Sequence, residues 1–223
     1  LTFQPPSLNK PIFQCKRLTI KQGEKGGIVG SVGSGKSTFL KLISGILTPT
    51  TGTVSFGSFN TTAINQADFR RDLAYLGQQP GIFSGSVRDN LVFGNEQVSD
   101  DEIISMMGVT GMNQVLKSLP NGLSYVLSEN GSELSGGQKQ ILALTRALVM
   151  RPIYILFDEP TSAMDPKHEK LFVKTMEEYV KNKTMLVVTH RKPILALTDR
   201  LIVIEDGQIV LDGNRDDVLR KFA

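Results

Sequence analysis

The chain has 223 residues, of which 40% are hydrophobic, and this is enough for one large domain with a well-buried core rather than a disordered segment. Its 25 basic and 22 acidic residues are spread without any block of like charge, so a nucleic-acid partner receives no support. The single cysteine, Cys15, cannot form an internal disulfide, and we expect an inert thiol in a reducing compartment.

The N-terminal part of the chain reads as short strands followed by a loop and a helix. It begins with Leu1 rather than methionine, so we expect a piece of a longer polypeptide. Strand-like segments with turn residues beside them, at residues 18–21 and 52–56, predict an antiparallel addition to a sheet. An apolar run at residues 27–30 leads into a glycine-rich loop, and a helix is expected over residues 37–44.

Helical spacing replaces strand-like alternation between residues 86 and 150. Ser99 and Glu102 form a capping box for a helix over residues 100–107, and a second helix is expected over residues 109–119. Ser135 opens a third helix over residues 136–150, which carries an apolar stripe. We therefore predict a single domain, residues 1–223, in which a helical subdomain (86–150) is inserted into an α/β core (1–85 and 151–223).

The C-terminal part returns to short apolar runs, at residues 153–158, 185–189 and 201–205, separated by helix-like segments. This alternation is typical of an α/β sheet whose strands are largely parallel and buried on both faces. No apolar run in the sequence approaches the ~18 residues that a membrane span needs.

A phosphate-binding loop lies between the first apolar strand and its helix. The pattern G-x-x-x-x-G-K-[ST] is satisfied by Gly30, Ser31, Val32, Gly33, Ser34, Gly35, Lys36 and Ser37, with Thr38 next in the helix. Glycines let successive N–H groups point at a phosphate, and the helix N-terminus adds a positive dipole. We expect Lys36 to bridge the β- and γ-phosphates of ATP and Ser37 to bind Mg²⁺.

The run at residues 153–158 supplies the second half of a nucleotide site. It ends in Asp158, which is expected to hold Mg²⁺ through water. Glu159 follows at the carboxyl end of the strand, where a carboxylate can polarise an attacking water. Taken alone, Glu159 also fits a solvated loop acid.

Several further motifs accompany these two halves. They are Leu134-Ser135-Gly136-Gly137-Gln138 (the signature segment), Gln78 after Tyr75-Leu76-Gly77, Ser162-Ala163-Met164-Asp165, and His190 at the end of the run 185–189. Alone, the signature segment is an ordinary helix start and His190 an ordinary strand-end residue. Together, in this order and spacing, the motifs resemble the nucleotide-binding domain of ABC transporters over essentially the whole chain.

The resemblance implies a role for each motif. Gln78 would contact Mg²⁺ and the attacking water, Glu159 would be the general base, and His190 would contact the γ-phosphate. Ser135, Gly136, Gly137 and Gln138 would contact the nucleotide of a second subunit, with Asp165 signalling across the same interface. A helix start with unobstructed N–H donors suits such an anion. The implied partners are a second copy of the domain, as a homodimer, and a transmembrane domain.

Finer features are similar to those of exporters. Residues 78–90 are similar to the segment after the glutamine loop of exporters, and Glu129-Asn130-Gly131 matches their short acidic loop. The Ser162 to Asp165 motif, Thr189-His190-Arg191 and residues 206–213 resemble the ATPase of bacterial type I protein-secretion exporters. That resemblance implies export of a protein or peptide, a place on the cytoplasmic face of the bacterial inner membrane, and periplasmic and outer-membrane partners.

Adenine recognition departs from the exporter pattern. The aromatic residue that stacks on adenine in exporters would fall near Pro5 by spacing. Phe3 is the candidate substitute, whereas Phe13 is expected to pack in the core.

Other functions remain open from the sequence. DNA-repair and chromosome-organising ATPase heads share the loop and signature segment, but a long coiled coil splits them and no sustained heptad pattern interrupts this chain. A nucleotide kinase or GTPase would not need the signature segment, and a regulatory domain without activity would not need Lys36 and Glu159. An exporter of lipid or small molecules stays an alternative to a protein exporter.

Overall fold

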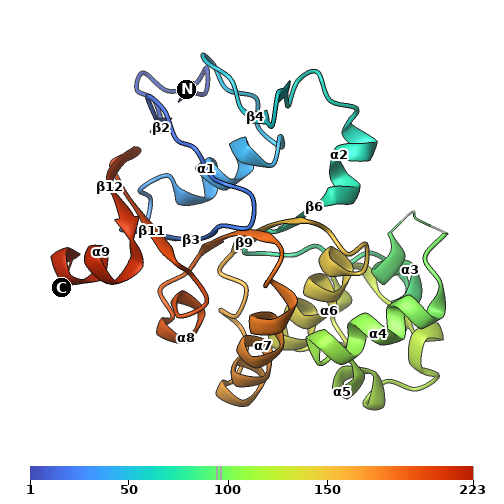
Figure 1. Ribbon diagram of the computed structural model, residues 1–223. Helices are drawn as coiled ribbons and strands as arrows, with labels where there is room; N and C mark the ends of the chain where they lie inside the picture. Colours follow the sequence, from blue (N-terminus) through green and yellow to red (C-terminus); the bar gives the residue numbers. More distant parts are fainter. Residues whose placement is uncertain (94, 96, 223) are drawn as a thin grey trace.

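The computed structural model describes residues 1–93, 95 and 97–222 (Figure 1). In these residues the main sheet has eight strands. In spatial order they are β1 (Thr2–Phe3), β2 (Phe13–Gln14), β12 (Gln208–Asn214), β11 (Arg200–Glu205), β3 (Lys25–Val29), β10 (Thr184–Val188), β9 (Tyr154–Asp158) and β6 (Leu73–Leu76). Two short antiparallel pairs lie outside it: β4 (Ser55–Phe56) with β5 (Phe59–Asn60), and β7 (Gly85–Ser86) with β8 (Val126–Leu127).

The middle of the sheet is parallel, and one edge is mixed, since β2 pairs with β12 in parallel between two antiparallel pairs. Strand β3 pairs in parallel with β10 and β11, and β9 pairs in parallel with β10 and β6. Antiparallel pairs join β11 to β12 and β1 to β2. The predicted fold class, a largely parallel sheet with antiparallel additions and helices, is confirmed.

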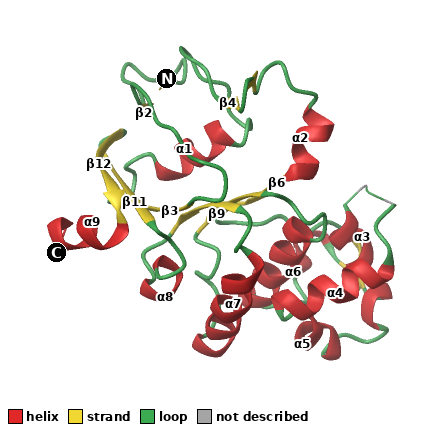
Figure 2. Ribbon diagram, in the orientation of Figure 1, coloured by secondary structure: helices red, strands yellow, loops and turns green. Residues whose placement is uncertain are grey.

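Helices cover both faces of the sheet, with α1 and α2 on one side and α6, α7 and α8 on the other (Figure 2). The helices are α1 (Lys36–Ile43), α2 (Gln66–Asp72), α3 (Val87–Val92), α4 (Asp100–Thr110), α5 (Met112–Lys117), α6 (Gly136–Leu148), α7 (Pro166–Tyr179), α8 (Lys192–Leu195) and α9 (Arg215–Phe222). Short 3₁₀ turns occupy Gly122–Ser124 and Glu129–Gly131. Within the described residues, no helix is both long and apolar enough to cross a membrane.

Successive residues of each central strand enter different cores. Leu156 and Leu186 pack with Phe39 of α1 in the core on one face. Ile155 and Phe157 pack with Leu142 of α6 in the core on the other face. Because side chains alternate across a strand, burial on both faces gives the continuous apolar runs of the sequence.

The core on the α6 face is continuous from the sheet into the helices of residues 86–150. The same buried cluster contains Met112 of α5, Ile103 of α4 and Val187 of β10. The division into a core and an inserted subdomain stays a prediction, since packing joins the two without a gap in the cluster.

Several element boundaries differ from those predicted. The described residues 18–21 form no strand: Leu18 and Ile20 pack against the core on the α1 face, while the Thr19 carbonyl accepts a hydrogen bond from Arg200. The predicted strand at residues 52–56 is reduced to Ser55–Phe56. The break between the helices predicted at 100–107 and 109–119 falls at Gly111, because this residue, with φ 81°, has a left-handed backbone that ends α4.

Candidate functional site

Four parallel strands bring the predicted catalytic motifs to one edge of the sheet. The phosphate loop follows β3, His190 follows β10, Asp158 ends β9, and Gln78 lies two residues beyond β6. In the sheet these strands are adjacent, in the order β3, β10, β9, β6. Ligands of open α/β sheets bind at the carboxyl ends of the strands, so this carboxyl edge is the candidate site.

The phosphate loop contains two glycines whose positive φ angles and close neighbours strongly disfavour a side chain. A β-carbon on Gly30 would lie 1.9 Å from the carbonyl oxygen of Ile204, and its φ is +147°. Gly35 has φ +99° and caps α1, and a β-carbon there would meet the Ile12 carbonyl oxygen at 3.0 Å. The loop is therefore shaped by contact with neighbouring backbone as well as by its own turns.

Lys36 and Ser31 are held by the loop and its neighbour. The buried Lys36 ammonium donates to the carbonyl oxygens of Gly30 and Ser31 at 2.8 and 2.6 Å. Ser31 donates through its N–H and its hydroxyl to the Glu205 carboxylate, which lowers the pKa of Glu205. Val32 is 99% exposed.

The donor set at the carboxyl edge fits ATP with Mg²⁺. Loop amides, the Lys36 ammonium and the start of α1 suit phosphate oxygens. Ser34 Oγ is buried in the loop without a hydrogen-bond partner among the described residues. The Ser37 hydroxyl and the Asp158 carboxylate are the oxygen ligands that Mg²⁺ prefers, and Mg²⁺ in phosphate sites takes few protein ligands.

Asp158 and Glu159 differ in surroundings although they are consecutive. Asp158 is 3% exposed, and Glu159 has φ +50°, a left-handed backbone that is uncommon for a residue with a β-carbon. Glu159 Oε1 lies 3.9 Å from His190 Nε2, with the Glu159 side chain 18% exposed. Burial raises the pKa of the Glu159 carboxyl, although the nearby His190 imidazole acts against the rise. A carboxylate with a raised pKa is a better proton acceptor.

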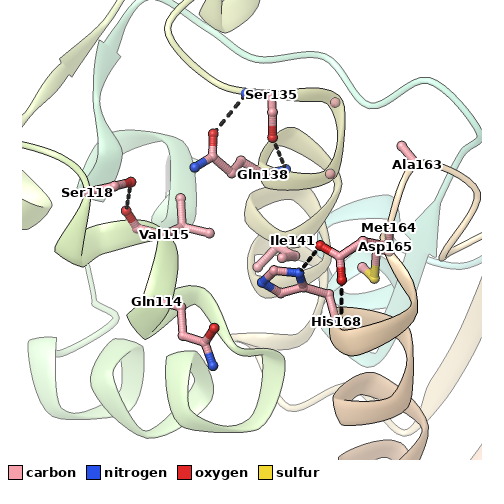
Figure 3. A pocket seen from close by; sticks show the side chains of 12 residues that line it. Gln114, Val115, Ser118, Ser135, Gln138, Ile141, Ala163, Met164, Asp165 and His168 are labelled. Atoms are coloured by element: carbon pink, nitrogen blue, oxygen red, sulfur yellow. Dashed lines mark hydrogen bonds and ion pairs between the residues drawn. The ribbon is translucent and has the colours of Figure 1, made fainter.

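The signature segment forms the N-terminus of α6 (Figure 3). Ser135 caps the helix: its hydroxyl accepts from Gln138 N–H at 3.3 Å, and its own N–H donates to Gln138 Oε1 at 2.8 Å. A cavity of about 500 Å³ opens beside this helix start, between α5, α6 and the segment before α7. Among the described residues that line it, none belongs to the phosphate loop.

Asp165 also lines that cavity, directly before α7 (Figure 3). Its carboxylate caps α7, accepting from the N–H groups of Lys167 and His168 at 2.9 Å each. His168 Nδ1 lies 2.6 Å from the same carboxylate. These contacts lower the pKa of the Asp165 carboxyl.

The structure thus separates the predicted residues into two groups. The phosphate loop, Asp158, Glu159, His190 and the exposed Gln78 share the carboxyl edge, whereas residues 135–138 and Asp165 share the cavity. Phe3 pairs with Phe13 across β1 and β2 and is half-buried against the core on the α1 face. Phe13 is fully buried and stacks on Phe39, which confirms it as a core residue. The roles assigned to the first two groups, and to Phe3, stay predictions.

Four residues beside these groups make contacts that the sequence did not predict. Glu205 fixes Ser31, and His168 lines the cavity. Arg191 pairs with Glu169 at 3.1 Å and donates to the Ser162 carbonyl at 3.3 Å. Gln140 is buried on α6 and bonds to the segment after β9. The pairing of His168 with Asp165 could have been found from their i, i+3 spacing at a helix start.

Comparisons with known proteins agree with the geometry. The family model described as ABC transporter matches residues 14–162. The chain is 38% identical to the lactococcin transport/processing ATP-binding protein LcnC-like of Lactococcus lactis over 204 residues, 91% of the chain and 28% of that protein. It is 36% identical to the ATP-dependent permease MDL1 of Candida albicans over 211 residues, 93% of the chain and 31% of that protein.

A solved structure, that of a bacterial Atm1-family ABC exporter with ATP bound, superposes with a TM-score of 0.90 and 27% identity over 100% of this chain and 39% of its own. The chain spans about a third or less of the length of the curated relatives it matches. The family model covers more than half of the chain. This chain belongs to the ABC transporter family and carries its ATP-binding domain.

Proposed function

We propose that the chain is the ATP-hydrolysing motor of an exporter and that two copies close around two ATP molecules with Mg²⁺. The observation that carries this proposal is the separation of the two groups of motifs. The phosphate loop, Asp158, Glu159, His190 and Gln78 share the carboxyl edge, whereas the signature segment lines a cavity elsewhere. A second copy can supply its own signature segment to that edge.

At the carboxyl edge each residue acts on a different part of the nucleotide. Lys36 leaves its two loop carbonyls and binds the β- and γ-phosphates together with the loop amides. Ser37, Asp158 and Gln78 orient the Mg²⁺, which when bound neutralises charge on the phosphate oxygens.

Glu159 is the proton acceptor of the hydrolytic step. Its raised pKa and its limited exposure suit a general base that takes a proton from the attacking water. His190, 3.9 Å from the Glu159 carboxylate and 55% exposed, is free to turn toward the γ-phosphate. A left-handed backbone at Glu159 fixes the direction from which its carboxylate approaches.

The paired arrangement follows from the start of α6. Ser135, Gly136 and Gly137 offer N–H groups and the positive end of the helix dipole to an anion. Asp165, which lines the same cavity, would meet the second copy at the same time. Both sets of motifs are complete in one chain, which favours two equivalent sites and a homodimer.

The cargo is proposed from the relatives. A lactococcin transport/processing protein among them supports export of a peptide or protein, as in bacterial type I secretion. On this proposal the chain works with a transmembrane domain at the cytoplasmic face of the bacterial inner membrane, and with periplasmic and outer-membrane partners. The name of the permease from Candida albicans states no cargo, so an exporter of lipid or small molecules stays the second candidate.

A mixing experiment tests the shared sites. In one variant chain, Ser135→Arg places a bulky side chain in the signature segment and should block its contact with ATP. In a second variant chain, Lys36→Met removes the ammonium that binds phosphate and keeps most of the side-chain stem. Each variant alone should be inactive with Mg²⁺ and ATP. Mixed in equal amounts, half of the dimers carry one complete site of two, so about a quarter of the parent turnover should return.

The controls separate shared from independent sites. Melting temperatures must show that both variants are folded, and EDTA should abolish the parent activity if Mg²⁺ is required. An inactive mixture of two folded variants contradicts the paired-site proposal. Activity of Ser135→Arg by itself would contradict it as well.

A further inference from the structure

Gln140 on α6 is a buried side chain that bonds to the catalytic segment. It lies five residues after Ser135 in the chain and is 2% exposed. Its Nε2 donates to the carbonyl oxygen of Glu159 at 2.9 Å and to Ser162 Oγ at 3.2 Å. Its Oε1 accepts from the N–H of Ala163 at 2.9 Å. One amide therefore holds both ends of the turn that follows β9.

The turn that Gln140 holds contains the strained backbone of Glu159. A φ of +50° is unfavourable for a residue with a β-carbon and persists only where the surroundings hold it. The N–H of Glu159 donates to the Val188 carbonyl of β10 at 2.9 Å. Its own carbonyl accepts from Gln140, so the peptide groups on both sides of the Glu159 α-carbon are fixed.

We propose that Gln140 is a positioning residue for hydrolysis, which ties the direction of the Glu159 carboxylate to the placement of α6. The inference rests on the proposed function. The signature segment at the start of α6 serves the nucleotide of a second copy, whereas Glu159 serves the nucleotide of its own chain. Gln140 joins these two parts within one chain, so a shift of α6 on closure also moves the Glu159 carbonyl.

A second contact shows what the link from α6 adds. Arg191, next to His190, donates to the Ser162 carbonyl at 3.3 Å and pairs with Glu169. The segment between Glu159 and Ala163 is thus held from the His190 side by Arg191 and from the α6 side by Gln140. The hydrogen bonds of Gln140 make the position of this segment depend on the position of α6 and its signature segment, whereas the bond from Arg191 does not.

The test compares Gln140→Met with a matched change on the same helix. Methionine keeps the length of the side chain and removes its three hydrogen bonds. Thr145 is also fully buried on α6 but does not contact Glu159. Thr145→Val removes the hydrogen bond between the Thr145 and Thr110 hydroxyls, which is 2.7 Å long. Melting temperature, ATP affinity, KM and kcat are measured for the 223-residue chain and both variants.

Gln140→Met should lower kcat by roughly 10- to 100-fold, because a catalytic group displaced by about 1 Å loses that much. The KM for ATP should stay within about threefold, since the phosphate loop is untouched. Thr145→Val should lower the melting temperature and leave kcat within about twofold of the parent. Combined with Glu159→Gln, Gln140→Met should add no more than about a twofold loss, because both act on one group.

Three results overturn the inference: an unchanged kcat in Gln140→Met, a loss of kcat no larger than that of an equally destabilised Thr145→Val, or a full additional loss on the Glu159→Gln background. If Gln140→Met does not fold, Gln140→Leu takes its place, since it also lacks the side-chain amide that donates to Glu159. A parent chain without ATPase activity would contradict the proposed function itself. An active parent with neutral Gln140 variants contradicts this inference alone.

Discussion

Replacing Gly137 by alanine should destabilise the chain, whereas the same change at Gly136 should not. Both glycines lie in the first turn of α6, and alanine gains up to about 1 kcal/mol over glycine in a helix at either position. A β-carbon on Gly136 would meet the Ala163 β-carbon at 3.6 Å, an ordinary contact. A β-carbon on Gly137 would lie 2.9 Å from the Ala163 carbonyl oxygen, which is too close.

The size of the effect is the difference in melting temperature between the two variants, because the preference of a helix for alanine over glycine is the same at both positions and cancels. Forcing an extra methyl into a packed site costs about 1–3 kcal/mol. In a chain of this size, that lowers the melting temperature of Gly137→Ala by roughly 2–12 °C relative to Gly136→Ala. The N–H of Ala163 donates a hydrogen bond to the Gln140 side chain, so Ala163 cannot move away without breaking that bond.

Thermal unfolding without nucleotide is the appropriate assay, since both glycines belong to the proposed ATP contact and would confound a comparison made with ATP. Calorimetry gives the two melting temperatures directly. Equal melting temperatures, or a more stable Gly137→Ala, would refute the reasoning from this contact.

Four further predictions concern other parts of the chain. Glu159→Gln should keep ATP binding but slow turnover roughly 10²- to 10⁴-fold in a single-turnover assay, as expected for loss of a general base. Burial raises the pKa of Glu159 in the folded state, so the protonated carboxyl is compatible with folding and the stability it allows is lost as pH rises through that pKa. The neutral amide of Glu159→Gln avoids this loss. The variant should therefore have a higher melting temperature than the parent at neutral pH, and the difference should vanish in acid. Arg146→Lys should lower the melting temperature despite the retained charge, since a lysine cannot reproduce the donors to Gly81 and Asn90. Leu142→Ala, at a fully buried site, should cost about 2–5 kcal/mol in chemical denaturation. In a full-length exporter, Phe83→Ala should reduce transport more than basal ATPase activity; equal loss of both with a lower melting temperature would make Phe83 a packing residue instead.

Local sequence patterns were sufficient for the central elements. The runs that became β9, β10 and β11 are apolar throughout because both faces are buried, and the capping box of Ser99 with Glu102 is confirmed at the start of α4. The phosphate loop lies between β3 and α1 as its pattern predicts. These features depend on neighbours a few residues apart, which a sequence displays directly.

Contacts between distant residues were beyond reach. Leu18 and Ile20 alternate like a strand, yet no strand among the described residues pairs with their backbone, and only the tertiary structure decides that. Gln140 reads as an interior helix residue, and its bond to Glu159 depends on how α6 lies against β9. The β7–β8 pair joins residues 85–86 to 126–127, inside a region whose spacing is otherwise helical.

The hydrogen bonds of Lys36 bear on how variants at this position are interpreted. Its ammonium donates to two carbonyl oxygens at the start of the phosphate loop, so Lys36→Ala removes two hydrogen bonds within the loop as well as a charge. Nucleotide, on arriving, competes with the chain's own carbonyls for the same ammonium. A Lys36→Ala variant that fails to bind ATP has therefore lost both the hydrogen bonds that shape the phosphate loop and the positive charge that binds phosphate. It represents the nucleotide-free protein only after its loop has been shown intact.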